Sequence, residues 1–245
     1  MLILALDMTT RAGSVALVRD GVVCSERQGD PARTHGQRLP GDVMAILDAA
    51  ALKIDDVELF AVASGPGSFT GLRIGIATVQ GLATAHGRNV VPVSALEALA
   101  RTVAHVMPDE RLIGTWMDAQ RGEVFAALYE ADGRTALEEH SGDTPSATLA
   151  RWRETRSLDS VLFVGDGAVR YAGVIQGGIS SATDILPAPS LAGAIGLIAA
   201  ENPGRAVSPH GVVPLYIRRP DAELARARRL ATGAAPNSSR DSARR

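Results

Sequence analysis

A glycine-rich segment between an apolar run and a helical stretch constrains the fold more than any other feature of this sequence. The segment from Ser64 to Gly75 reads SGPGSFTGLRIG, and the apolar run Glu58–Ala63 before it is typical of a strand buried on both faces. At such a strand-to-helix turn, backbone N–H groups and the helix N-terminus can hold an anion. The segment lacks the Gly-Lys-Ser/Thr of a P-loop and the third glycine of a dinucleotide-binding fingerprint. It therefore indicates an α/β protein without specifying a ligand.

Three glycines lie inside the helix that is predicted to run from this segment to about His86, namely Gly71, Gly75 and Gly81. Each interior glycine costs roughly 1 kcal/mol relative to alanine, so a close backbone approach should offset the cost. Two explanations are open, contact with a phosphate or tight packing of the helix within the chain or across an interface. Packing is the simpler of the two.

Apolar periodicity predicts strands and helices in alternation along the chain. Strands are predicted at 2–6, 14–18, 22–24, 58–63, 89–93, 112–117, 124–130 and 160–164, and helices at 36–52, 69–86, 94–106 and 191–200, with a short helix after Gly167. This order predicts mixed or parallel sheets with helices packed on them. A break at Met107-Pro108-Asp109 predicts a first lobe over 1–107, a second over 108–221 and a basic, disordered tail over 222–245.

Two aspartate-containing turns follow predicted strands, one in each half of the chain. Carboxylates and hydroxyls at a strand end can orient a magnesium-bound phosphate, although Asp and Thr are also ordinary turn residues. The candidate phosphate contacts, with the glycines that add backbone N–H groups, are Asp7, Thr9, Thr10, Gly65, Gly67, Asp166 and Gly167. One such turn in each half suggests a cleft between two lobes.

Residues for conventional catalysis or metal binding are sparse. Cys24 is the only cysteine, and no two of the five histidines are three or four residues apart, so a local metal pair cannot form. No G-x-S-x-G motif occurs. We therefore expect no metal site and no conventional catalytic constellation.

The 245 residues carry a net charge of −2. This balance argues against a protein that binds nucleic acid over its whole surface, because such binding requires an excess of basic residues. The end of the chain differs, since from Arg218 onward eight arginines face only Asp221, Glu223 and Asp241. Such tails contact nucleic acid or acidic partners, although a solvated end is the simpler interpretation. The absence of a signal peptide and of a long apolar run predicts a cytoplasmic protein without a membrane segment.

Several short motifs occur in an order that resembles the TsaB (YeaZ) family. Proteins of this family are bacterial components of the machinery that makes N6-threonylcarbamoyladenosine at position 37 of tRNAs. The resemblance covers about residues 1–220, and the segment SGPGSFTGLRIG is its most specific part. The other matching segments are Asp7-Met8-Thr9-Thr10, VSALEAL at 93–99, DAQRGEV at 118–124, Gly165-Asp166-Gly167-Ala168 and PLYIR at 214–218.

This resemblance implies the two-lobed actin/hexokinase/Hsp70-like α/β fold and a non-catalytic subunit that pairs with TsaD, with TsaE in the wider complex. It implies that tRNA is bound only through the complex, and that ATP or ADP with magnesium binds at most weakly or within the complex. TsaD holds a metal through two histidines spaced H-x-x-x-H, and the matching positions here are Ala95 and Leu99. The alternatives are an active ATP-dependent enzyme of the same fold class and a glycoprotease-like peptidase.

Two predicted helices, about 37–52 and 69–85, carry apolar stripes that one sheet face need not cover. The resemblance implies that such subunits pair through two helices from each chain, and the same surface could form a homodimer when the partner is absent. The alternative is that both stripes face this chain's own sheet. The candidate interface residues are Leu39, Val43, Met44, Leu47, Gly71, Leu72, Gly75, Ile76 and Val79.

Overall fold

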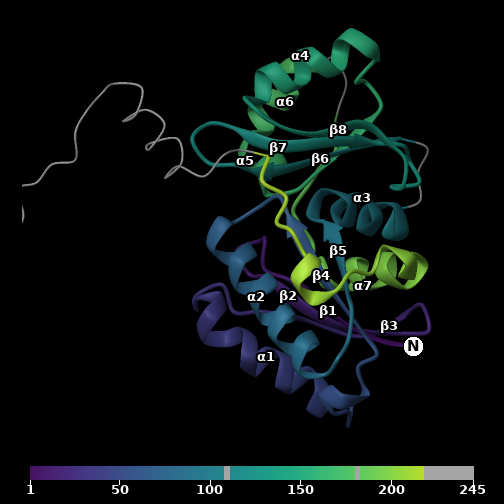
Figure 1. The fold of residues 1–245 in the computed structure, drawn as a ribbon. Coiled ribbons are helices and arrows are strands. Elements are labelled where there is room, and N and C mark those ends of the chain that lie inside the picture. Colours follow the sequence, from purple (N-terminus) through teal and green to yellow (C-terminus); the bar gives the residue numbers. More distant parts are fainter. Residues whose placement is uncertain (108–110, 180–182, 218–245) are drawn as a thin grey trace, which may run out of the picture.

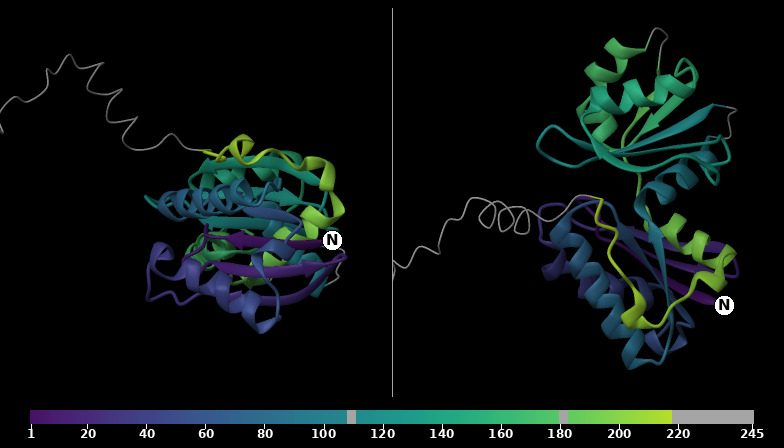
Figure 2. Two further views of the ribbon diagram at one scale, coloured as in Figure 1. Left: turned by 60° about the horizontal axis from the view of Figure 1, so that its bottom comes forward. Right: turned by 45° about the horizontal axis from the view of Figure 1, so that its top comes forward.

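The chain forms two lobes, each built around a five-stranded mixed sheet with helices packed on it (Figure 1). The structure is a computed structural model that describes residues 1–107, 111–179 and 183–217. Figure 2 shows the same two lobes from other sides, with the C-terminal segment, in yellow, running along the first lobe toward the second. The protein therefore has the two-lobed α/β architecture that the sequence predicts.

The first sheet begins with an antiparallel meander and continues with two parallel strands. Its strands are β1 (Leu2–Asp7), β2 (Ser14–Arg19), β3 (Val22–Gln28), β4 (Leu59–Gly65) and β5 (Val90–Ser94), in the spatial order β3-β2-β1-β4-β5. In β1, Leu4 lies opposite Leu17 of β2 and opposite Phe60 of β4. Because β1 and β4 are parallel neighbours, Asp7 and Gly65 end their strands at the same edge of the sheet.

The second sheet repeats this plan. Its strands are β6 (Leu112–Asp118), β7 (Val124–Tyr129), β8 (Ala136–Asp143), β9 (Val161–Val164) and β10 (Ile185–Leu186), in the order β10-β9-β6-β7-β8. Again the first strand pairs antiparallel with the second and parallel with the fourth. The carboxyl end of β6 therefore occupies the place in the second lobe that the end of β1 occupies in the first.

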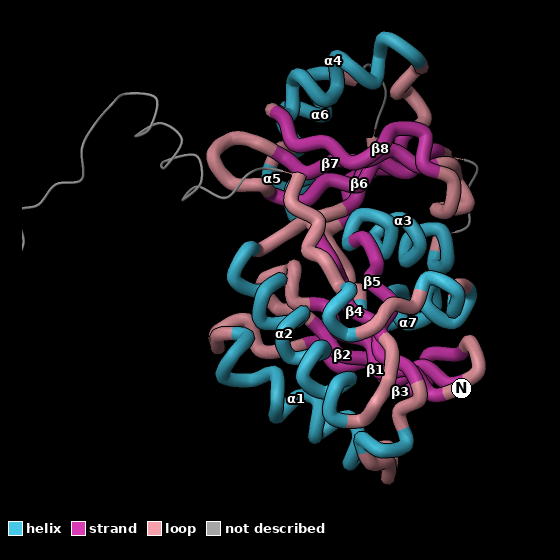
Figure 3. The backbone as a smooth tube through the Cα atoms, in the orientation of Figure 1, coloured by secondary structure: helices cyan, strands magenta, loops and turns pink. Residues whose placement is uncertain are grey.

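The helices form layers on both faces of the first sheet and on the outer face of the second (Figure 3). The helices are α1 (His35–Ala49), α2 (Phe69–Ala85), α3 (Ala95–Val106), α4 (Pro145–Thr155), α5 (Asp166–Arg170), α6 (Ala172–Gly178) and α7 (Ala192–Glu201), with 3₁₀ turns at Ile54–Asp56, Pro203–Arg205 and Pro209–Gly211. α1 and α2 cover one face of the first sheet, whereas α3 and α7 cover the other. α3 also packs on β6, so it lies between the two sheets.

Local capping residues explain where several helices begin. The Ser68 hydroxyl accepts the Gly71 N–H at the start of α2 (3.3 Å), and the Ser94 hydroxyl accepts the Glu97 N–H at the start of α3 (3.4 Å). Thr144 caps α4 in the same way, with Pro145 in the first turn. These side chains satisfy backbone donors that would otherwise lack a partner at a helix N-terminus.

The structure corrects one part of the predicted lobe assignment. The sequence placed residues 108–221 in the second lobe, but α7 packs on β1, β2 and β4 of the first sheet. The physical reason is that α7 is apolar almost all round, with Ile195 and Ile198 wholly buried, and fills the open face beside α3. The chain thus returns to the first lobe near Leu191, whereas the predicted tail at 222–245 lies outside the described residues.

Four further elements were not predicted, namely β8, α4, α6 and β10. Most of the other elements lie within a few residues of their predicted bounds. Residues 213–217, a short apolar run, form neither a helix nor a strand. Within the described ranges, no helix combines the length and the apolar character that crossing a bilayer requires.

Candidate functional site: the cleft between the lobes

A cleft of about 1010 Å³ lies between the lobes, at the carboxyl ends of their central strands. The first lobe lines it with Thr9, the β3–α1 loop from Pro31 to His35, and residues 66–74 of the glycine-rich segment. The second lobe contributes Asp118 and Asp166, among others, and the C-terminal segment contributes residues 215–217. The predicted cleft is therefore present, and both aspartate-containing turns reach it.

Asp7 does not face this cleft. Its side chain is wholly buried at the end of β1, and Oδ1 accepts both the N–H (2.7 Å) and the hydroxyl of Thr9. Oδ2 accepts the Thr10 hydroxyl (2.9 Å), and Thr10 in turn accepts the Gly13 N–H (3.1 Å). Both carboxylate oxygens are engaged in closing the β1–β2 turn, so this arrangement does not fit a magnesium ion held by Asp7.

The glycine-rich segment packs closely on that same turn. The Ser68 N–H donates to the Thr9 carbonyl (2.9 Å), and a Cβ on Gly67 would stand only 2.5 Å from the Cβ of Thr9. Gly65 lies under the C-terminal segment, where a Cβ would approach the Leu215 carbonyl oxygen to 2.8 Å. Among the predicted phosphate contacts, Thr9 and Gly67 thus line the cleft, whereas Thr10 and Gly65 do not.

The turn of the second lobe is closed by backbone donors in a similar way. Oδ1 of Asp166 accepts the N–H groups of Gly167 (2.9 Å) and Asp118 (3.0 Å), and Asp118 pairs with Arg170 at 2.9 Å. Burial of its carboxyl group, with a smaller effect from the neighbouring Asp118, raises the pKa of Asp166. Asp166 lines the cleft, whereas Gly167 lies beneath it against the backbone of Met117 and Asp118.

The glycines of α2 are explained by close packing within the chain. A Cβ on Gly71 would overlap the carbonyl oxygen of Met8, and a Cβ on Gly75 would stand 3.1 Å from the Met8 side chain. Gly81 has open space around its Cα. Two of the three glycines therefore let α2 approach the end of β1, which sets the position of the cleft wall.

A buried arginine that the sequence analysis missed supports the β1–β2 turn from below. Arg38 is 3% exposed, pairs with Asp42 at 2.7 Å and donates to the Ala12 carbonyl. The ring nitrogen Nδ1 of His35 lies 2.7 Å from Arg38 Nη2. Burial, and to a smaller degree the Arg38 charge, lowers the pKa of His35, which favours a neutral ring that accepts from the guanidinium. An arginine within an apolar helical stripe is the signal that could have revealed it.

The predicted interface stripes on α1 and α2 are wrong for most of their residues. The side chains of Leu39, Val43, Leu47, Leu72, Ile76 and Val79 are at most 5% exposed and belong to the core between these helices and the first sheet. Gly71 and Gly75 are buried against Met8. Only Met44 of the predicted set is open to solvent, with 56% of its surface exposed. The sheet covers the stripes because both helices lie flat on the same face of it.

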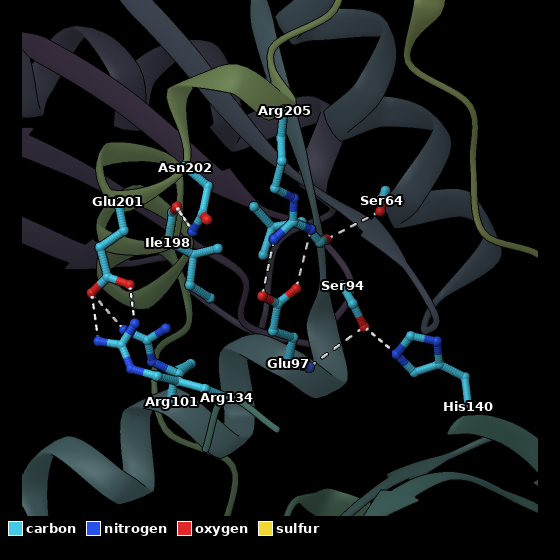
Figure 4. Close-up of polar contacts among 11 residues, drawn as sticks. Ser64, Ser94, Glu97, Arg101, Arg134, His140, Ile198, Glu201, Asn202 and Arg205 are labelled. Carbon is cyan, nitrogen blue, oxygen red and sulfur yellow. Dashed lines mark hydrogen bonds and ion pairs between the residues drawn. The ribbon is translucent and has the colours of Figure 1, made fainter. Parts of the chain in front are cut away.

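A second polar network joins the lobes on the other side of the first sheet, around α3 (Figure 4). Glu201 of α7 binds Arg101 of α3 and Arg134 of the β7–β8 turn, each at 2.6 Å. Nε2 of His140, on β8, lies 2.9 Å from the Ser94 hydroxyl. A serine beside a histidine is the geometry of a nucleophile and its base. Ser94, however, is 7% exposed and caps α3, and it does not line the cleft between the lobes.

Within the described residues, no group of three or more His, Cys, Asp and Glu side chains could hold a metal ion. Two lobes with the same strand order and a cleft at their strand ends define the class of this protein, which is the actin/hexokinase/Hsp70-like α/β class. Component A of the (R)-2-hydroxyglutaryl-CoA dehydratase of Acidaminococcus fermentans shares this fold. It superposes with a TM-score of 0.51 at 12% identity, covering 83% of this chain and 99% of that chain.

Comparisons with known proteins then place the chain within that class. The family model described as TsaD, tRNA N6-adenosine threonylcarbamoyltransferase, matches residues 27–162. The tRNA threonylcarbamoyladenosine biosynthesis protein TsaB of Bacillus subtilis is 31% identical over 231 residues, which cover 91% of this chain and 96% of that protein. The structure of YeaZ from Pseudomonas aeruginosa has a TM-score of 0.72 at 30% identity, covering 88% of this chain and 99% of that chain. The chain belongs to the TsaB family, whose members take part in the biosynthesis of threonylcarbamoyladenosine in tRNA.

Proposed function

We propose that this chain is a non-catalytic subunit that pairs with a TsaD-type transferase during formation of N6-threonylcarbamoyladenosine at position 37 of tRNAs. TsaE belongs to the wider complex, and any ATP or ADP with magnesium binds this chain only weakly or within that complex. The B. subtilis relative is a biosynthesis protein for this modified nucleoside, and the matching family model describes the transferase. The proposal assigns the group transfer to the partner.

The observation that carries the proposal is the environment of the two positions that match the TsaD metal ligands. Ala95 and Leu99, in the first two turns of α3, are both wholly buried in the core between the two sheets. An alanine methyl and a leucine side chain supply no metal ligand, and their apolar surroundings offer no replacement. The buried Asp7 supports the same conclusion, because its oxygens are already engaged in the β1–β2 turn.

The outer faces of α1 and α2 are the surface that we assign to the partner, in place of the buried stripes. These two helices lie next to each other on the first lobe (Figure 1). Most of their exposed residues are small, with a few polar residues among them. The exposed residues of α1 are Gly36, Gln37, Pro40, Gly41, Met44, Asp48 and Ala49, and those of α2 after its first turn are Arg73, Ala77, Gly81, Thr84 and Ala85. Small residues let the helices of a partner approach at a short interaxial distance, and Met44 supplies an apolar anchor.

Met44→Arg should therefore abolish pairing while leaving the fold intact. An arginine at the centre of an apolar contact adds an unpaired charge that costs several kcal/mol when the interface closes, so the affinity should fall by roughly a hundredfold or more. The measurement is co-elution with TsaD on a sizing column, together with the melting temperature of the isolated chain.

Two further variants make this test specific. Val22→Arg changes another exposed apolar residue (63%), at the start of β3 rather than on α1 or α2, and should leave pairing unchanged. Ile76→Arg places the charge in the core and should unfold the chain. If Met44→Arg co-elutes with TsaD as the unaltered chain does, the outer face is not the pairing surface.

A further inference from the structure

The two aromatic side chains that are exposed in the described structure lie against each other at the rim of the cleft. They are Phe69, the first residue of α2, and Tyr216 in the C-terminal segment, with ring centroids 5.5 Å apart. They are 40% and 39% exposed, whereas the other aromatic residues are buried or half-buried. Exposed rings gathered in one place mark a contact surface.

An arginine completes this cluster. The guanidinium carbon of Arg73 lies 4.0 Å from the centroid of the Phe69 ring, and its Nε donates to the Tyr216 hydroxyl at 3.2 Å. We call Phe69, Arg73 and Tyr216 the aromatic rim. All three line the cleft between the lobes, so a molecule bound in the cleft could reach them.

The charge around the aromatic rim favours an anion. Arg11 and Arg33 line the same cleft, and no carboxylate in the described ranges pairs with either of them or with Arg73. The acidic residues of the lining are already engaged, because Asp118 pairs with Arg170 and Asp166 accepts two backbone N–H groups.

Aromatic faces beside arginines whose charge no carboxylate neutralises form the combination that binds single-stranded nucleic acid, because bases stack on rings while arginines contact phosphates. We propose that the aromatic rim binds an unpaired nucleotide of RNA, with a base stacked on Phe69 and Tyr216 and the backbone phosphates held by the cleft arginines. This inference rests on the proposed function, which supplies a tRNA substrate. It goes beyond that function because this chain itself would contact the RNA.

The aromatic rim could instead serve only to fasten the C-terminal segment to α2. That segment has an independent attachment, since the Leu215 N–H donates to the Ser64 carbonyl at 2.7 Å. Changing one ring should therefore leave the segment in place. If the aromatic rim binds RNA, changing one ring should weaken RNA binding without changing the melting temperature. If the rim only fastens the segment, the same change should leave RNA binding as it is.

The test is fluorescence anisotropy of a short, unstructured, labelled RNA oligonucleotide with the full chain, over a series of salt concentrations. Phe69→Leu and Tyr216→Leu should each weaken binding roughly tenfold, the scale of a lost base–aromatic stack. Arg73→Gln should lower the slope of log affinity against log salt by about one unit, because one phosphate contact is lost. Val213→Ala, at a 71% exposed position of the same segment, is the matched control and should bind as the unaltered chain does.

Two results would overturn the inference. The first is that the unaltered chain does not bind the oligonucleotide, and the second is that folded rim variants bind it equally well. In the second case, a loss of co-elution with TsaD would make the rim a protein contact. The assay uses this chain alone. A negative RNA-binding result would therefore overturn this inference without contradicting the proposed pairing with TsaD, which the co-elution experiment tests.

Discussion

Gly71→Ala should destabilise the protein by about 3 kcal/mol or more, although it adds a single methyl group to a helix. The added Cβ would overlap the carbonyl oxygen of Met8 and stand 3.0 Å from the His35 ring. A backbone carbonyl cannot rotate away as a flexible side chain can, and Met8 is fixed between the buried Asp7 and Thr9. α2 would therefore have to move away from the end of β1, opening the cleft wall.

Gly81→Ala provides the matched control in the same helix. Nothing lies within 4 Å of a Cβ at Gly81, so the usual gain of an alanine over a glycine, about 1 kcal/mol, should appear as added stability. Chemical denaturation of both variants gives the two free energies of unfolding. Equal effects at the two positions would show that Gly71 is not needed for close packing against Met8.

Arg38→Ala should cost about 3–5 kcal/mol of folding free energy, because it leaves a buried carboxylate without its main partner. Arg38 binds Asp42 at 2.7 Å, and its guanidinium fills the space that Gly13 and Gly29 leave open. The change would also remove the donor to the Ala12 carbonyl and so loosen the β1–β2 turn at the cleft. The measurement is again denaturant unfolding at neutral pH.

Arg27→Ala serves as the comparison, because Arg27 binds the same carboxylate from the surface. Its side chain is 55% exposed and lies 3.4 Å from Asp42, so its loss should cost under about 1 kcal/mol. The double change Arg38→Met with Asp42→Leu should recover much of the stability, since no uncompensated charge remains. A small effect of Arg38→Ala alone would mean that Asp42 is satisfied in another way.

The local signals in the sequence predicted most of the first lobe. Apolar runs and helical spacing act over a few residues, so β1 to β5 and α1 to α3 lie close to their expected bounds. β8 and α4 were missed because their sequences, ALEEHSGD and PSATLARWRET, have no clear apolar alternation or stripe. β8 pairs with β7, which directly precedes it in the chain, whereas α4 packs against α6, which comes later in the chain.

The sequence could not predict whether the apolar face of a helix packs on this chain's own sheet or on a partner. An apolar stripe on α1 has the same pattern whether it faces this chain's sheet or a partner. The neighbouring residues Val43 and Met44 were assigned to one surface, but one is 5% and the other 56% exposed. Asp7 shows the same limit, because its role depends on hydroxyl groups that turn toward it in three dimensions. The cleft itself was predictable because both turns follow central strands.

The most direct test of the account is threonylcarbamoyl transfer to tRNA by purified TsaD and the other components of the reaction, with and without this chain. We expect transfer to require both proteins, and this chain alone with ATP and magnesium to show no turnover. Transfer that proceeds equally well when this chain is omitted would contradict the account. So would turnover on the order of 1 per second by this chain alone, which is an ordinary rate for an enzyme.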